Sequence, residues 1–117
     1  MQHPNSKGRR MNILVIEDEI KIADFVVSGL QNAGFQTSHV TDGLSGLNAI
    51  VSGQHDLVVL DVMLPRLSGM EVLQQVRQQG ILVPIIILSA KGDLPDRLTA
   101  FGHGVDDYLP KPFLLKS

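Results

Sequence analysis

The sequence contains no cysteine and no tryptophan, and only 4% of its residues are aromatic. Without cysteine, the chain forms no disulfide framework, no cysteine-based zinc site and no thiol nucleophile. Its apolar runs are far shorter than the roughly 20 residues that span a bilayer. The first ten residues are not followed by an apolar stretch, so they do not form a secretory signal. We therefore expect a soluble, cytoplasmic protein without a membrane partner.

The composition is that of one globular domain. The chain has 117 residues, of which 44% are hydrophobic and 19% charged, and single cores commonly occupy about 100–150 residues. Residues 1–10 hold three basic residues and no acid; without them the chain has 7 basic and 12 acidic residues, a net charge of −5. A body of this sign lacks the basic surface that nucleic-acid binding requires. We expect residues 1–10 to be a flexible leader or a cloning remnant, and residues 11–117 to form the domain, with no direct contact to nucleic acid.

Short β-branched runs alternate with segments of helical periodicity along the chain. Glycines at positions 34, 53 and 80 stand where three helices are expected to end. The pattern predicts strands at residues 12–16, 35–40, 57–60, 85–88 and 108–109. Strands that alternate with helices indicate repeated βαβ units, which form a doubly wound α/β fold with a parallel sheet and helices on both faces. The chain stops seven residues after Pro110, so we expect the fifth helix to be largely missing and one flank of the sheet to be less covered.

Polar side chains follow the strands of this predicted sheet. Residues 17–19 (Glu-Asp-Glu) follow the first strand, Asp61 the third, Ser89 the fourth and Lys111 the fifth. Because ligands bind beyond the carboxyl ends of parallel strands, we expect these groups to meet at one edge. Carboxylates about 4 Å apart repel by about 4 kcal/mol per pair at an effective dielectric near 20. Lys111 and a hard divalent cation such as Mg²⁺, which prefers oxygen ligands, offset this repulsion.

A single acid at a strand end is often no more than a helix cap. Four strand ends that carry acid, acid, hydroxyl and amine in this order are harder to explain as caps. The combination therefore favours a functional site over a structural one.

Four ordered motifs stand at the strand ends: VIEDE (15–19), LDVMLP (60–65) followed by Gly69, LSA (88–90) and DDYLPKPF (106–113). Together they resemble the receiver domain of two-component response regulators, and their spelling is closest to the subfamily with a winged-helix DNA-binding domain. The match covers residues 11–113. The resemblance implies a flavodoxin-like five-stranded parallel sheet with strand order 2-1-3-4-5.

The resemblance also implies a role for each site residue. Asp61 is the phosphoacceptor, which takes a phosphoryl group from a phosphohistidine of a partner sensor histidine kinase. Asp18 is a direct Mg²⁺ ligand, Glu17 holds a metal-bound water, and the backbone carbonyl of Met63 completes the protein's share, with Asp61 also a ligand. Lys111 pairs with Asp61 and then with a phosphoryl oxygen.

Further positions match the switch and the dimer face of the family. Ser89 is the hydroxyl that donates to the phosphoryl group, and Tyr108 is the aromatic residue that rotates inward. Arg97, Asp106 and Asp107 match charged members of the face through which the winged-helix subfamily dimerises. Their usual partners lie on the fifth helix, so a homodimer is an open expectation.

Other proteins with this fold fit the sequence less well. A flavodoxin needs a Ser/Thr/Gly-rich phosphate loop after the first strand, a haloacid dehalogenase-type phosphatase needs an acid where Met63 stands, and a P-loop signature is absent. The remaining alternative is a pseudo-receiver that serves only as an interaction module. We expect a phosphoacceptor signalling domain that catalyses only its own phosphorylation and dephosphorylation. It would regulate an output such as transcription through a DNA-binding domain absent from this chain.

Overall fold

The computed structural model describes residues 10–89 and 107–111 and shows five parallel strands in one sheet, with strand order β2-β1-β3-β4-β5. The predicted fold class and strand order are therefore confirmed. In chain order, the elements are β1 (Asn12–Ile16), α1 (Ile20–Asn32), β2 (Gln36–Val40), α2 (Gly43–Val51), β3 (Leu57–Asp61), α3 (Gly69–Gln78), β4 (Ile85–Ser89) and β5 (Asp107–Pro110).

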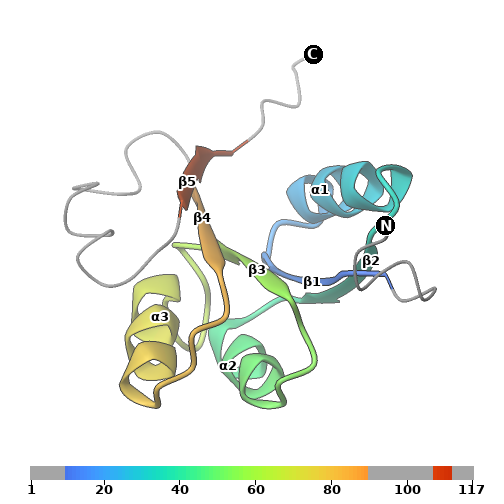
Figure 1. Cartoon of the computed structure of the whole chain (residues 1–117). Coiled ribbons are helices and arrows are strands. Elements are labelled where there is room, and N and C mark those ends of the chain that lie inside the picture. Colours follow the sequence, from blue (N-terminus) through green and yellow to red (C-terminus); the bar gives the residue numbers. More distant parts are fainter. Residues whose placement is uncertain (1–9, 90–106, 112–117) are drawn as a thin grey trace.

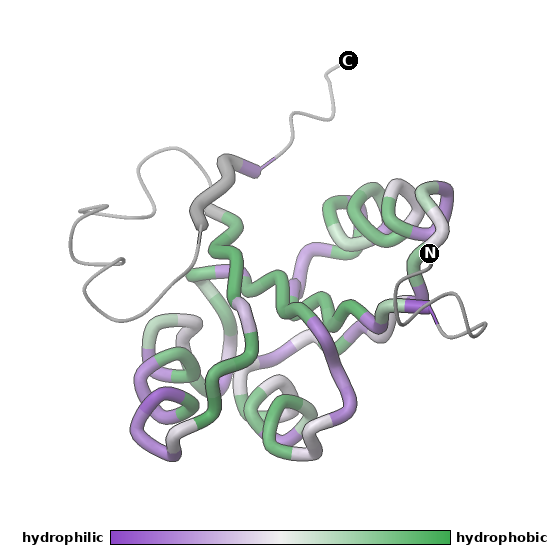
Figure 2. Tube along the Cα trace, viewed as in Figure 1, coloured by the Kyte–Doolittle hydropathy of each residue, from purple (hydrophilic) through white to green (hydrophobic). Residues whose placement is uncertain are grey.

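The sheet is covered on both faces. Helix α1 lies on one face, and α2 and α3 lie side by side on the other (Figure 1). Alternate residues of each strand point to opposite faces, so Ile13 and Val15 pack toward α1, whereas Leu14 and Ile16 pack toward α2 and α3. The central strands are hydrophobic along most of their length, as Figure 2 shows. This pattern is typical of strands buried on both faces.

Capping interactions fix where the second and third described helices begin. At α3, the Ser68 hydroxyl accepts a hydrogen bond from the Glu71 backbone N–H at 3.2 Å, and the Glu71 carboxylate accepts one from the Ser68 backbone N–H at 3.0 Å. At α2, the Asp42 carboxylate accepts a hydrogen bond from the Ser45 backbone N–H at 2.8 Å. That bond is the main reason why the pKa of Asp42 lies below its usual range. These caps satisfy backbone donors that the first helical turn leaves unpaired.

Helix α2 approaches the sheet closely because Gly46 has no side chain. A Cβ atom at Gly46 would lie 2.6 Å from Ile16 Cδ1, closer than van der Waals contact allows. The start of α2 also contacts the loop after β3, where the Gly43 N–H donates to the Pro65 carbonyl at 3.1 Å. Helix α2 is thus held against the loop that begins at Asp61.

Several sequence-based expectations lie outside the described residues: residues 1–9 of the leader, the absence of most of the fifth helix, and the dimer-face residues Arg97 and Asp106. None of the helices that the structure describes is long and apolar enough to cross a membrane.

Candidate functional site

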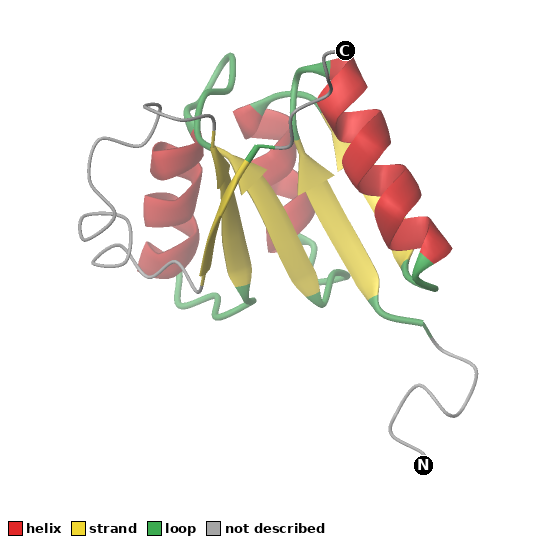
Figure 3. Cartoon of the chain, turned by 90° about the horizontal axis from the view of Figure 1, so that it is seen from above, coloured by secondary structure: helices red, strands yellow, loops and turns green. Residues whose placement is uncertain are grey.

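The carboxyl ends of the strands lie at one edge of the sheet (Figure 3). Ile16 of β1 pairs with Leu60 of β3. The residues that follow them, Glu17 and Asp61, therefore lie next to each other at this edge. On the other side, the Glu17 N–H donates to the Val40 carbonyl of β2 at 3.1 Å. The parallel register therefore brings the first and third strand ends together, as the sequence predicted.

Three carboxylates gather at this edge. One carboxylate oxygen each from Glu17, Asp18 and Asp61 lie within 4.8 Å of one another. Glu17 and Asp61 are completely buried, whereas Asp18 is exposed. Buried carboxylates this close together require a compensating positive charge or the uptake of a proton.

Lys111, immediately after β5, supplies one such charge. Its Nζ atom lies 2.8 Å from Glu19 Oε1, 3.3 Å from Asp61 Oδ1 and 3.7 Å from Glu17 Oε1. Burial alone would lower the pKa of Lys111, but the hydrogen bond to Glu19 and the charges of Asp61 and Glu17 outweigh it and hold this pKa above its ordinary value. The lysine is therefore a cation in the resting site.

The two oxygens of Asp61 have different surroundings. Oδ1 contacts Lys111 and accepts a hydrogen bond from the Met63 backbone N–H at 3.3 Å, whereas Oδ2 is buried and accepts none from the described residues. Burial raises the pKa of Asp61 above its ordinary value, while Lys111 and the Met63 N–H oppose the rise. Oδ2 therefore keeps its lone pairs available for a ligand.

The backbone of Asp61 is packed from behind by the start of α3. A Cβ atom at Gly69 would clash with the Asp61 carbonyl oxygen, and would lie 2.9 Å from both the Asp61 carbonyl carbon and Val62 Cα. The Gly69 N–H donates to the Val62 carbonyl at 2.9 Å. Only glycine fits here, so the residue fixes the backbone that carries Asp61.

Glu17 is held by groups from two elements. Its Oε2 accepts a hydrogen bond from the Glu19 N–H at 3.0 Å, and its backbone carbonyl accepts one from Nε2 of His39 at 2.7 Å. Burial raises the pKa of Glu17 to about 7; the Glu19 N–H and the Lys111 ammonium lower it, while the charge of Asp61 raises it further. Oε1 accepts no hydrogen bond from the described residues.

The donor set fits a hard divalent cation. All the side-chain ligands at this edge are carboxylate oxygens, which Mg²⁺ prefers over the imidazole and thiolate ligands of zinc or copper. Two buried oxygens, Glu17 Oε1 and Asp61 Oδ2, have no hydrogen-bond donor among the described residues. A buried acceptor without a donor is costly, and a bound cation would satisfy both. The Met63 residue contributes a backbone N–H to Asp61.

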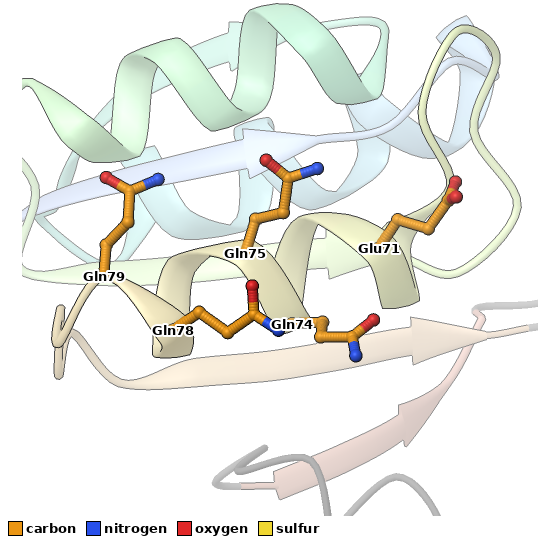
Figure 4. A pocket seen from close by; sticks show the side chains of 5 residues that line it. All are labelled: Glu71, Gln74, Gln75, Gln78 and Gln79. Carbon is orange, nitrogen blue, oxygen red and sulfur yellow. The ribbon is translucent and has the colours of Figure 1, made fainter.

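A separate hollow runs along the outer side of α3. It is lined by a row of uncharged amides and one acid, Glu71, Gln74, Gln75, Gln78 and Gln79 (Figure 4). Glu71 is already used in the helix cap. The hollow includes none of the residues of the acidic edge, and we place the functional site at that edge.

Two residues that contact the site were not given a role from the sequence. Glu19 was visible as part of an acidic run, but nothing in the run indicates that its carboxylate reaches Lys111, 92 positions away. His39 has no motif around it, and its proximity to Glu17 arises from the pairing of β1 with β2.

The remaining predicted residues are placed by their backbones. Asp61 pairs with Leu88, so Ser89 lies one residue further along β4, and the Val62 N–H donates to the Leu88 carbonyl at 3.3 Å. Tyr108 lies in β5 opposite Ile87, and Asp107 is the first residue of that strand. The backbone of Ser89 is thus adjacent to the acidic edge.

The fold and this edge together define a doubly wound α/β domain that joins buried carboxylates and a lysine at the carboxyl ends of its strands. The chain belongs to the response regulator receiver domain family, whose model matches residues 13–117. This confirms the resemblance seen in the motifs.

The relatives include several transcriptional regulators. The chain is similar to the response regulator protein PmrA from Pseudomonas aeruginosa, with 43% identity over 103 residues, which cover 88% of this chain and 47% of that protein. It is also similar to the transcriptional regulatory protein QseB from Haemophilus influenzae, with 46% identity over 105 residues, or 90% and 48% of the two chains. The chain thus spans about half the length of these curated relatives, as expected from the resemblance to the winged-helix subfamily.

Solved receiver domains share the fold over nearly all of their length. The receiver domain of the Francisella response regulator 1452 superposes with a TM-score of 0.81 and 37% identity, covering 88% of this chain and 85% of that one. The receiver domain of NtrX from Brucella abortus gives a TM-score of 0.78 and 34% identity, with 86% of each chain covered.

Proposed function

We propose that this receiver domain accepts a phosphoryl group on Asp61 from a phosphohistidine of a sensor histidine kinase. The observation that carries the proposal is the pairing of a buried carboxylate with Lys111 at 3.3 Å, beside a second oxygen that accepts no hydrogen bond from the described residues. A carboxylate with free lone pairs next to a fixed cation is suited to nucleophilic attack on an anionic group.

In the proposed step, an Asp61 oxygen attacks phosphorus, and the phosphorus–nitrogen bond of the kinase histidine breaks. The electron pair of that bond returns to the imidazole, and the product is an acyl phosphate on Asp61. Lys111 Nζ lies 3.3 Å from Asp61 Oδ1, so its ammonium would also pair with an oxygen of the phosphoryl group bound to Asp61 and stabilise the charge that develops there. The Met63 N–H donates to Oδ1 and keeps the carboxylate oriented. The protein is both catalyst and substrate, and its chemistry is limited to forming and losing this acyl phosphate.

The acidic edge would hold Mg²⁺ through Asp18 and Asp61, with Glu17 and the Met63 carbonyl completing the set. When bound, Mg²⁺ neutralises charge that develops on the phosphoryl oxygens. The three carboxylate oxygens lie within 4.8 Å of one another, and two buried oxygens lack donors among the described residues; both observations support this assignment.

The switch and the output belong to the same proposal. Ser89 follows Leu88, the residue that pairs with Asp61, and would donate to the phosphoryl group, with Tyr108 of β5 responding to it. Such a response is a two-state change driven by new charge-assisted hydrogen bonds. Arg97, Asp106 and Asp107 would form the dimer face, and the output in the cytoplasm would be transcription, carried by a domain beyond this chain.

The test is incubation of the domain with a small phosphodonor and Mg²⁺, followed by mass spectrometry of the intact protein. We expect one added phosphoryl mass, which Asp61→Asn abolishes because an amide is not a nucleophile for phosphorus. Asp24→Asn is the matched control, since it removes an exposed acid on α1 and should leave the adduct intact. Chelation of the metal should also prevent the adduct.

Two results would contradict the proposal. If wild-type protein gains no mass at any Mg²⁺ concentration, the domain is a pseudo-receiver that acts only by binding. If Asp61→Asn gains the same mass as wild type, the phosphoacceptor is another residue.

A further inference from the structure

The shortest contact of Lys111 is with Glu19. The Nζ atom lies 2.8 Å from Glu19 Oε1 and 3.3 Å from Asp61 Oδ1. The Glu19 side chain is 57% exposed, whereas Asp61 is completely buried. Water can hydrate an exposed carboxylate, so Glu19 does not need the lysine for its own solvation. The contact therefore matters for the position of Lys111 more than for the stability of Glu19.

The position of Glu19 in the fold leaves its carboxylate available for the contact with Lys111. Glu19 is the N-cap residue of α1, and its backbone carbonyl accepts the hydrogen bond of the Ala23 N–H at 2.9 Å, but its side chain makes no capping hydrogen bond. Its own N–H donates to Glu17 Oε2 at 3.0 Å. The backbone of Glu19 thus serves the helix and Glu17, and its carboxylate is left to reach across to Lys111.

We infer that Glu19 is a positioning residue that restrains Lys111 in the resting site by competing with Asp61 for its ammonium group. The inference rests on the proposed function. In the unphosphorylated domain, the ammonium is shared among Glu19, Asp61 and Glu17. A phosphoryl group on Asp61 carries roughly 1.5 to 2 negative charges and outcompetes a single exposed carboxylate. Lys111 then leaves Glu19 for the phosphoryl oxygen.

The inference predicts that Glu19→Gln makes phosphorylation faster and Mg²⁺ binding weaker. Without the carboxylate, Lys111 is freer to meet an incoming phosphoryl oxygen, so the phosphorylation rate at saturating Mg²⁺ should rise roughly threefold to fivefold, the range expected for one partly exposed ion pair. The released ammonium also moves toward Glu17 and Asp61, where it opposes a cation. The Kd for Mg²⁺, measured by calorimetry without phosphodonor, should therefore rise by a similar factor.

Two comparisons separate this role from a general effect of charge. Asp24→Asn, on the exposed side of α1, removes the same charge and should change both quantities by less than about twofold. The calorimetric effect of Glu19→Gln should shrink to less than about twofold in a Lys111→Met background, because the effect acts through the lysine. Glu19→Asp keeps the charge but shortens the reach, and should give an intermediate rate.

The outcomes are distinct. A Glu19→Gln variant that is phosphorylated at the wild-type rate or more slowly overturns the inference, and so does an Mg²⁺ effect that persists in full without Lys111. The inference also fails if the role of Glu19 is only structural. In that case Glu19→Gln lowers the thermal unfolding midpoint, and Glu19→Asp restores this midpoint without giving the intermediate phosphorylation rate. Absence of any adduct on wild-type Asp61 contradicts the proposed function itself, whereas an adduct formed at an unchanged rate contradicts only the role of Glu19.

Discussion

Glu17 is a buried acid whose protonation can be measured through the stability of the fold. Its side chain is 0% exposed, and burial raises its pKa from 4.5 to about 7. Between these pH values the folded state keeps a proton that the unfolded state has lost, so folding is favoured by protonation. This contribution is fully present below pH 4.5 and is lost as the pH rises through about 7. Since one pKa unit corresponds to about 1.36 kcal/mol, the free energy of unfolding should fall by about 3 kcal/mol over this interval.

The variant Glu17→Gln isolates this effect because its side chain does not titrate. Urea unfolding followed by far-ultraviolet circular dichroism, with a chelator present, should show that the variant gains about 3 kcal/mol relative to wild type between pH 4.5 and pH 8. An Asp24→Asn variant controls for the change in net charge. A difference between Glu17→Gln and wild type that does not vary with pH would refute the reasoning, because it would mean that the buried carboxylate is not destabilised by its surroundings.

Two further predictions concern the supports of the site. Gly69→Ala should destabilise the fold by about 1–3 kcal/mol, because the new methyl group overlaps the Asp61 backbone. Gly29→Ala is the control: no atom lies within 4 Å of the added Cβ, so it should stabilise α1 by about 0.5–1 kcal/mol. Urea unfolding measures both free energies, and equal stabilities of the two variants would contradict the packing argument. His39→Leu removes the hydrogen bond to the Glu17 carbonyl and should weaken Mg²⁺ binding roughly tenfold, while His39→Gln, which keeps a donor, should remain near wild type. Calorimetry measures both constants, and identical values for the two variants would exclude a positioning role.

The fold could be predicted because each strand carries its own signal. The β-branched runs at the centres of β1, β3 and β4 are buried on both faces, so these strands are apolar apart from one polar residue at an end of each. Tertiary contacts decide some strand boundaries, and there the structure differs from the sequence pattern. Phe35 was expected in the second strand, but its N–H closes the end of α1 by donating to the Leu30 carbonyl at 3.1 Å, and β2 begins one residue later. The fifth strand extends to residues 107–110 because β4 provides the pairing partner.

The site could be predicted only in part. A doubly wound parallel sheet brings the acids at the ends of β1 and β3 to one edge, and the strand order 2-1-3-4-5, which the resemblance implied, makes these two strands neighbours. The contacts of Glu19 and His39 depend on side-chain reach between segments that are distant in sequence. No local pattern encodes such reach, so the sequence indicated which charges gather but not how the lysine is shared among them.

Lys111 follows the edge strand of the described sheet but contacts residues at its centre. β5 pairs only with β4 among the described strands, but the lysine that follows it contacts Glu19 before α1 and Asp61 at the end of β3. In the proposed phosphorylated state, the negative charge added to Asp61 would draw the ammonium of Lys111 away from Glu19 and toward a phosphoryl oxygen, because one ammonium cannot pair equally with both anions. A change at the buried carboxylate of β3 would thus be felt at the carboxylate that precedes α1 through a single side chain.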